Sequence, residues 1–122
     1  MIKNAVNWFE IPVSDLSRAT EFYEGILATS LIQESMGDID MAIFPYGEKT
    51  VTGSLVAAPF LSPSETGSIV YLNAEGIIDE VLDRVTEKGA AIPMPKMHIG
   101  ENGFIAHIID SEGNRVGLHS MT

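Results

Sequence analysis

Apolar residues recur along the chain with two different periods. In residues 5–13, Phe9, Ile11 and Val13 fall on one face and polar residues alternate with them, which predicts a strand. The following segment repeats apolar residues at steps of three and four, which predicts an amphipathic helix. The residues of this stripe are Leu16, Ala19, Phe22, Tyr23, Ile26 and Leu27. Asp15 is a suitable N-cap, because its carboxylate can accept from the free N–H groups of a first helical turn.

The same order of elements occurs twice. Residues 59–67 (PFLSPSETG) hold two prolines, two serines and a glycine and indicate a linker between the two halves. Beyond it, apolar residues from Ile77 to Val85 predict a second helix, and Gly89 stands where a C-terminal cap belongs. Further strands are predicted at 31–35, 41–45, 51–58, 68–73, 91–94, 103–109 and 115–119.

Each half therefore has the order strand, helix and three strands, which predicts a duplicated βαβββ module. We place the modules at residues 1–60 and 67–122 of a single α+β domain that spans 1–122. One module alone would leave a face of its curved sheet uncovered. Two paired modules can enclose that face, so we expect a curved, incomplete barrel-like sheet around a cavity.

Composition narrows the possible partners. The 122 residues include 17 acidic and 7 basic side chains, a formal net charge of -10, which disfavours nucleic acid and anionic membranes. The absence of cysteine excludes disulfides, thiolate zinc sites and a cysteine nucleophile. The apolar run at 55–61 is too short to span a bilayer, and the first residues lack the apolar region of a secretory signal. We expect a cytoplasmic protein.

Two segments carry a family resemblance. FEIPVSDLSRATEFYEGIL (residues 9–27) and DSEGNRVGLHS (residues 110–120) resemble the opening and closing segments of the vicinal oxygen chelate superfamily. That superfamily includes glyoxalase I, bleomycin-resistance proteins and extradiol dioxygenases. The resemblance implies paired βαβββ modules, a homodimer, and a cavity that in many members holds a divalent metal.

The metal ligands implied by the resemblance are His, Glu or Gln, one from the first and one from the last strand of each module. Here the corresponding positions are Trp8, a residue within 52–58 (TGSLVAA), Gly67-Ser68, and Gly117. None of them supplies a side chain suited to a divalent metal. We therefore expect no metal site and no other cofactor.

Five residues are candidates for the wall of the cavity. Glu10 shares a strand face with Trp8, so it is either a general base or hydrogen-bond acceptor for a ligand, or a structural carboxylate paired with Arg115. Arg115 and His119 share a face of the last strand, where Arg115 binds an anionic ligand or, as we prefer, forms a salt bridge with one of the acids. Trp8 and Tyr71 either form an aromatic pocket for a planar ligand or fill the core.

The three histidines match no local metal motif. His98, His107 and His119 are separated by nine and twelve residues. We predict His98 in a loop, and His107 in the middle of a strand as a hydrogen-bonded structural residue. Whether any of the three contributes to a site is left open.

Three functions remain. The preferred one is binding of a small molecule in the cavity between the modules without the family's metal, and the acidic balance would suit a cationic ligand. The second is a lyase or isomerase similar to glyoxalase I, with a non-standard metal site or with Glu10 as base. The third is a non-catalytic association domain.

Overall fold

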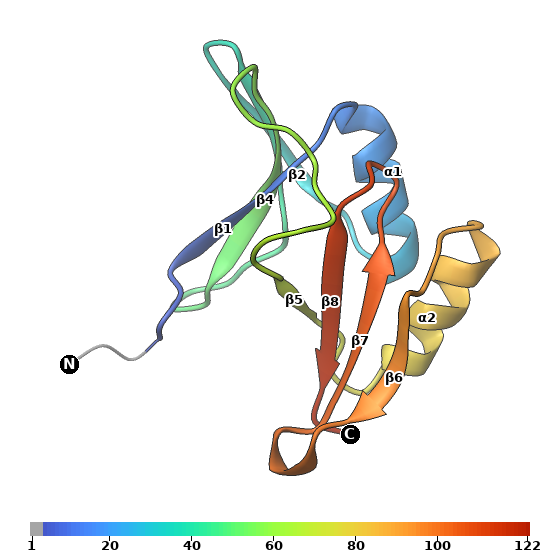
Figure 1. Ribbon diagram of the computed structural model, residues 1–122. Helices are drawn as coiled ribbons and strands as arrows, with labels where there is room; N and C mark the ends of the chain where they lie inside the picture. The colour runs from blue at the N-terminus through green and yellow to red at the C-terminus, as the bar shows by residue number, and fades with distance from the viewer. Residues whose placement is uncertain (1–3) are drawn as a thin grey trace.

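Each half of the chain forms one four-stranded sheet with one helix against it, as the computed structural model in Figure 1 shows for residues 4–122. The first half contains β1 (Trp8–Pro12), α1 (Leu16–Leu27), β2 (Ile32–Met36), β3 (Ile39–Ile43) and β4 (Thr52–Ala57). The second contains β5 (Tyr71–Asn73), α2 (Ile78–Glu87), β6 (Met94–His98), the short 3-10 helix η1 (Gly100–Asn102), β7 (Phe104–Ile109) and β8 (Arg115–Ser120). The predicted α+β class and repeated βαβββ order are confirmed.

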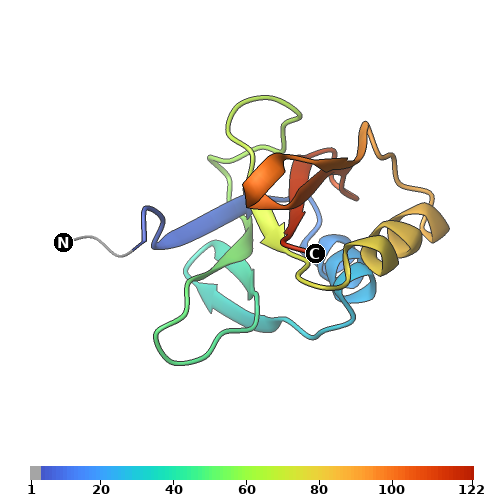
Figure 2. The same cartoon turned by 90° about the horizontal axis from the view of Figure 1, so that it is seen from below.

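The two sheets have the same topology. Their strand orders are β1-β4-β3-β2 and β5-β8-β7-β6, and the first and last strands of each half pair in parallel. The remaining neighbours are antiparallel. The sheets stay separate and open, at an angle to each other, so the expected barrel is incomplete (Figures 1 and 2).

The helices begin and end where their capping residues predict. The Asp15 carboxylate accepts from the backbone N–H of Arg18 at 3.0 Å, which confirms it as the N-cap of α1. After α2, Gly89 adopts a φ of 77°, the left-handed conformation that glycine reaches without strain. The apolar stripe of α1 buries Ala19, Phe22, Tyr23 and Ile26.

A single core lies between the helices and both sheets. The helices pack against each other, and the Arg84 guanidinium on α2 donates to the Ile26 carbonyl of α1 at 3.1 Å. Figure 2 shows the two helices on the same side of the molecule. Buried residues that contribute from the strands include Ile11, Ala42, Leu55, Leu72, Ala106, Ile108, Val116 and Leu118. Because one core serves both modules, their relative position is fixed by packing.

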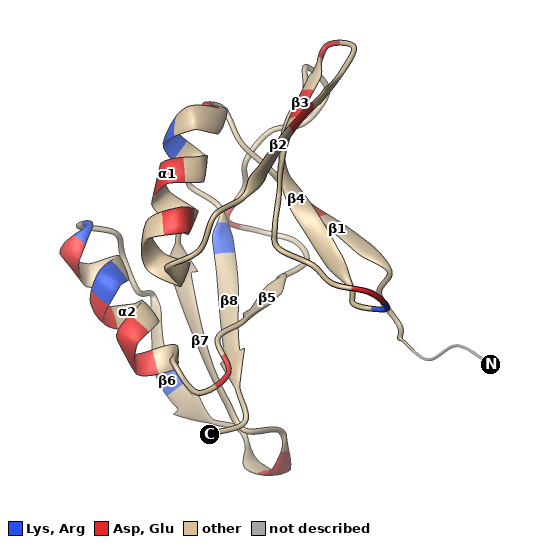
Figure 3. Cartoon of the chain, turned by 180° about the vertical axis from the view of Figure 1, so that it is seen from behind, with Lys and Arg blue, Asp and Glu red and all other residues tan. Residues whose placement is uncertain are grey.

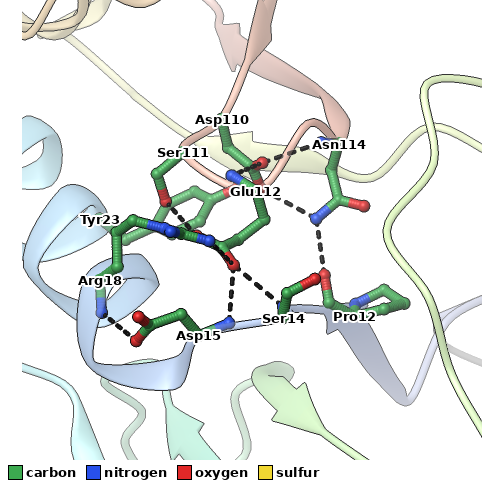
Figure 4. Close-up of polar contacts among 9 residues, drawn as sticks. All are labelled: Pro12, Ser14, Asp15, Arg18, Tyr23, Asp110, Ser111, Glu112 and Asn114. Atoms are coloured by element: carbon green, nitrogen blue, oxygen red, sulfur yellow. Dashed lines mark hydrogen bonds and ion pairs between the residues drawn. The ribbon is translucent and has the colours of Figure 1, made fainter.

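The turn between β7 and β8 closes onto the start of α1 (Figure 4). The buried Glu112 carboxylate accepts from the Arg18 guanidinium at 2.7 Å and from the backbone N–H groups of Ser14 and Asp15 at 2.9 and 2.8 Å. The hydrogen bond from Arg18, together with those from the backbone, lowers the pKa of Glu112 to about 2. A charge from the second module thus supports the N-terminus of the helix in the first.

A second set of contacts lies beside this carboxylate. The Tyr23 hydroxyl donates to Asp110 at 2.6 Å, and burial raises the pKa of Tyr23 well above its usual value. The Asn114 amide donates to Asp110 at 3.0 Å and to the Pro12 carbonyl at 2.7 Å (Figure 4). These buried polar groups join α1, β1 and the β7–β8 turn, so the two modules are linked by hydrogen bonds as well as by packing.

Three predicted strands are displaced. The strand expected at 91–94 is β6 at Met94–His98, so His98 lies in a strand and not in a loop. β6 is an edge strand with an irregular register between Met94 and Met97, where Pro95 is tolerated because edge residues need not donate to the ladder. β5 is shorter than predicted and begins at Tyr71, while β3 begins at Ile39 and not at residue 41.

Acidic side chains are spread over both helices and several connections (Figure 3). Within residues 4–122, no helix combines the length and the apolar character needed to cross a membrane.

Candidate functional site

On the face of the first sheet opposite α1, the edge strand β1 exposes side chains, whereas Ser54 and Val56 of the neighbouring strand β4 are buried. On β1, Trp8 and Glu10 are exposed while Ile11 is buried in the core, as the alternation predicts. Trp8 is 45% exposed and Tyr71 on β5 is 43% exposed. Neither aromatic ring is therefore ordinary core filling, although the two do not form a stacked pair among the described residues.

A small polar pocket of about 170 Å³ lies where the two sheets meet. Glu10 of β1 and Arg115 of β8 both line it. The connection between β4 and β5 supplies four hydroxyl-bearing residues to its wall, Ser62, Ser64 and Thr66 of the linker and Ser68 directly after it. The linker is held here because the Ser64 N–H donates to the Asn114 side chain at 2.9 Å and the Arg115 N–H donates to the Ser64 carbonyl at 3.2 Å.

The two charged residues of this pocket are not paired with each other. Within residues 4–122, the ion pairs closer than 4.0 Å are Arg18–Glu112 and Lys96–Asp79, so the predicted salt bridge of Arg115 is wrong. The Nε–H of Arg115 instead donates to Nδ1 of His107 at 2.9 Å, because the two side chains share a face of neighbouring strands. Glu10 accepts a long hydrogen bond of 3.4 Å from the Trp8 indole. Opposite charges thus face one pocket, and both remain available to a ligand.

A larger apolar cleft of about 1030 Å³ adjoins the polar pocket. It lies between the β3–β4 connection and β5, and its aromatic and aliphatic walls include Phe9, Phe44, Tyr46, Val51, Tyr71 and Ile77. Ser68 and Val70 line both the cleft and the polar pocket, so the two spaces share a wall. Together they offer an apolar surface with charged groups at one end.

Tyr71 is held in place by a side chain two strands away. Its hydroxyl lies 2.7 Å from Nε2 of His107. The ring crosses above Gly117, where a Cβ would overlap it. Burial, and then the charge of Arg115, lowers the pKa of His107. His107 is structural and hydrogen-bonded, as predicted, but its partners are two candidate site residues.

The other predicted histidines lie apart. His119 donates from Nε2 to the Asn102 carbonyl at 2.6 Å and lines neither the polar pocket nor the apolar cleft. His98 packs against the Phe104 ring, with centroids 4.9 Å apart. In the part of the chain that the structure describes, no three His, Asp or Glu side chains are grouped as metal ligands. Of the five predicted residues, Glu10 and Arg115 share a pocket, Tyr71 lines the cleft, and Trp8 and His119 line neither space.

Comparison with known proteins places this architecture in a family. Residues 5–118 match the family model of the glyoxalase/bleomycin resistance protein/dioxygenase superfamily. The chain belongs to this superfamily. CFP32 of Mycobacterium bovis, which carries the provisional name of a glyoxylase, is 30% identical over 122 residues, covering 92% of this chain and 44% of CFP32. The chain therefore spans less than half the length of the curated relatives it matches.

Solved structures of the superfamily share the fold. The glyoxylase/bleomycin resistance protein/dioxygenase domain from Frankia sp. EAN1pec aligns with a TM-score of 0.73 at 17% identity, over 96% of this chain and 97% of that one. TnmS3, an antibiotic binding protein from Streptomyces sp. CB03234, aligns with a TM-score of 0.68 at 25% identity, over 100% and 99% of the two chains. Fosfomycin resistance protein FosX of Listeria monocytogenes reaches 0.70 at 18% identity, over 98% and 91%.

The residues at the superfamily's metal positions do not fit a divalent ion. Trp8 presents an indole, and β4 has the sequence TGSLVA without a His, Glu or Gln. Ser68 lies before the start of β5. Gly117 has no side chain, and the Tyr71 ring lies where one would extend. These four positions therefore supply no ligand set through which a metal could take part in a reaction.

Sequence reasoning missed two features of the site. Residues 62–68 carry a hydroxyl at every second position, a period that could have suggested one polar face. Ser54 lies beside Glu10 in the parallel pairing of β1 and β4. Its hydroxyl is buried and has no hydrogen-bond partner among the described residues. Only the strand register identifies this neighbour of Glu10.

Proposed function

We propose that the protein binds a small molecule whose apolar, planar body lies in the cleft and whose charged end reaches the polar pocket. The observation that carries this proposal is the shared wall between an apolar cleft and a pocket with unpaired Glu10 and Arg115. Apolar concavities with a few polar groups are typical of small-molecule sites. The description of TnmS3 as an antibiotic binding protein, at 25% identity over the whole chain, supports a binding function.

A panel of planar aromatic ammonium compounds and carboxylates tests this proposal by calorimetry and thermal shift. We expect Val51→Asp, which puts a carboxylate into the cleft, to weaken binding at least about tenfold. Ile99→Asp is the matched control, because Ile99 is 37% exposed, close to the 41% of Val51, and lies outside the cleft. Equal affinities of both variants, or no binding by any member of the panel, would contradict the proposal.

An enzyme of the glyoxalase I type is the second candidate, with Glu10 as general base. The exposed Glu10 carboxylate has a single long hydrogen bond and faces the Arg115 pocket, so it is free to accept a proton. The name of CFP32 supports the same class of lyase or isomerase. Turnover of the hemithioacetal of methylglyoxal and glutathione, lost in Glu10→Gln and kept in Glu65→Gln, would favour this function. Activity that survives Glu10→Gln would remove Glu10 from the role of base.

We also infer that the protein works without a bound metal, in the cytoplasm, and as a homodimer. Action without a metal is supported by Trp8 and Gly117, which stand at metal-ligand positions of the superfamily and offer no ligand. Elemental analysis that finds one tightly held metal per chain would overturn this inference. A homodimer is supported by membership of the superfamily, whose members are often dimers. A non-catalytic association domain, the third candidate, predicts a dimer that binds no member of the panel.

A further inference from the structure

The strand register brings three side chains into one hydrogen-bonded chain. Tyr71 on β5 pairs with Gly117 on β8, and Gly117 pairs with His107 on β7. Strands separated by one neighbour lie about 10 Å apart, so two long side chains can meet only above a residue that does not obstruct them. Gly117 is that residue, and the Tyr71 hydroxyl reaches His107 across it at 2.7 Å. Arg115, on the same face of β8, contacts the other ring nitrogen of His107 at 2.9 Å.

The direction of each hydrogen bond follows from Arg115. A guanidinium only donates, so Nδ1 of His107 must accept and carries no proton. The neutral imidazole then has its proton on Nε2, and this N–H donates to the Tyr71 oxygen. The phenol proton of Tyr71 is therefore not used toward His107. No other hydrogen-bond acceptor for it occurs among residues 4–122.

We propose that Tyr71 is a fixed hydrogen-bond donor to an oxygen of the bound molecule, held with its proton outward by His107 and Arg115. The ring is 43% exposed and lines the apolar cleft, so a ligand can reach it. The matching chemistry is a planar molecule with a carbonyl, carboxylate or phenolate oxygen. This inference rests on the proposed binding function and identifies the group that recognises the ligand's oxygen.

The Tyr71 side chain lies above Gly117, the position where the superfamily would place a metal ligand. At Gly117 there is no side chain, and the phenol occupies the adjacent space. A hydrogen-bond donor backed by a guanidinium can stabilise negative charge on an oxygen, although it acts by a directed proton and not as a Lewis acid. His107 and Arg115 are positioning residues in this arrangement, because they act on the ligand through Tyr71.

The first test needs no ligand. Long-range ¹H–¹⁵N NMR at pH 7.5 reports the tautomer of each histidine, and we expect His107 to carry its proton on Nε2. Arg115→Met removes the donor to Nδ1, so we expect the signals of His107 to move toward a mixture of tautomers. Lys96→Met is the control, since Lys96 lies on the same sheet but pairs with Asp79. A proton on Nδ1 in the wild type, or no change in Arg115→Met, would overturn the inference.

The second test uses 4-nitrophenolate, whose visible band shifts to shorter wavelength when its oxygen accepts a hydrogen bond. We expect the band of the dye bound to wild-type protein to lie at shorter wavelength than that of the dye bound to Tyr71→Phe, and this variant to lose about tenfold in affinity. Tyr46→Phe is the matched control, because Tyr46 lines the same cleft and its hydroxyl forms no hydrogen bond with residues 4–122. His107→Gln can still donate to Tyr71 and should keep more of the shift than His107→Leu.

The results of these tests distinguish a failure of the role of Tyr71 from a failure of the proposed binding function. Binding that Val51→Asp abolishes but Tyr71→Phe leaves unchanged would overturn the role of Tyr71 and keep the cleft as a binding site. A wild-type protein that takes up no 4-nitrophenolate would also overturn the role of Tyr71. The aromatic panel then decides the binding function independently.

Discussion

Two glycines show how single residues determine what can lie beside a strand. A Cβ at Gly53 would overlap the carbonyl and the ring of Phe9, which belong to the strand paired with β4. The three atoms nearest to a Cβ at Gly117 would all belong to the Tyr71 ring, which is a side chain and not backbone. Gly53 therefore allows the close approach of two backbones, while Gly117 allows a hydrogen bond to form above it.

We expect Gly53→Ala to destabilise the protein by about 1–3 kcal/mol, because the Phe9 backbone cannot move away without disturbing the β1–β4 pairing. Urea unfolding at pH 7 measures the change. Gly47→Ala is the control, since no atom lies within 4 Å of its added Cβ, and its effect should stay within about 0.5 kcal/mol. Equal midpoints for the two variants would contradict the expectation.

His107 should titrate below its ordinary pKa of 6.5, because burial and the Arg115 charge both disfavour the imidazolium. The unfolded chain then takes up this proton at a higher pH than the folded one. The neutral His107 side chain therefore contributes to the free energy of unfolding. This contribution is complete above pH 6.5 and is lost as the pH falls through 6.5 toward the lowered pKa. NMR titration measures this pKa, and Arg115→Met should raise it. A value at or above 6.5 in the wild type would contradict the assignment.

The sequence predicts which face a site residue occupies better than which neighbour it contacts. The alternation on β1 correctly separates Trp8 and Glu10 from the core, because a period of two follows directly from strand geometry. The contact between Tyr71 and His107 depends on the register of three strands, which no local pattern contains. The salt bridge predicted for Arg115 was wrong for the same reason, since a nearer partner lies on β7.

Among the elements, those buried on one side were predicted best. Both helices follow stripes that pack into the core, and β7 and β8 lie close to their predicted ranges. The edge strand β6 was misplaced because its residues are mostly exposed and include Pro95, so neither alternation nor propensity identifies it. Edge position is a property of the sheet and is not encoded by the segment itself.

The Glu112 carboxylate in the β7–β8 turn should make the stability of the protein depend on pH. The pKa of Glu112, about 2, is well below its ordinary value of 4.5, mainly because Arg18 donates to it. The depressed pKa contributes stability above pH 4.5, and this contribution is lost as the pH falls toward 2. The shift corresponds to about 3 kcal/mol, and solvent screening at the exposed Arg18 reduces this to about 2 kcal/mol.

We therefore expect Glu112→Gln to lower the free energy of unfolding by about 2 kcal/mol at pH 7 and by much less at pH 2.5. Urea unfolding at both pH values measures the difference. Glu65→Gln is the control, because this exposed side chain forms no hydrogen bond among the described residues. A loss that is the same at both pH values would show that the carboxylate charge does not stabilise the turn.

At the scale of the whole molecule, duplication accounts for the two matching sheets but not for the site between them. The modules share strand order and helix placement, while the polar pocket also needs the linker, which has no counterpart inside either module. Composition alone predicts an acidic domain, and the structure adds that a positive and a negative side chain line one pocket at the junction of the sheets. Shape and charge of the cavity thus arise only when both modules and the linker are assembled.

The outward face of the first sheet leads to the last prediction, that two copies of the chain associate. Ile32 and Met36 on β2 are 51% and 65% exposed and share this face with Trp8. Glu34 lies between Ile32 and Met36 on the same strand face, and such mixed surfaces of apolar and polar side chains are typical of protein interfaces. We expect light scattering after size exclusion to give twice the mass of the chain. Met36→Asp should shift the protein to monomer, whereas Ile99→Asp, which alters an exposed residue between β6 and η1, should leave the dimer intact. A wild-type monomer at about 100 μM, far above the Kd of a stable dimer, would contradict the association.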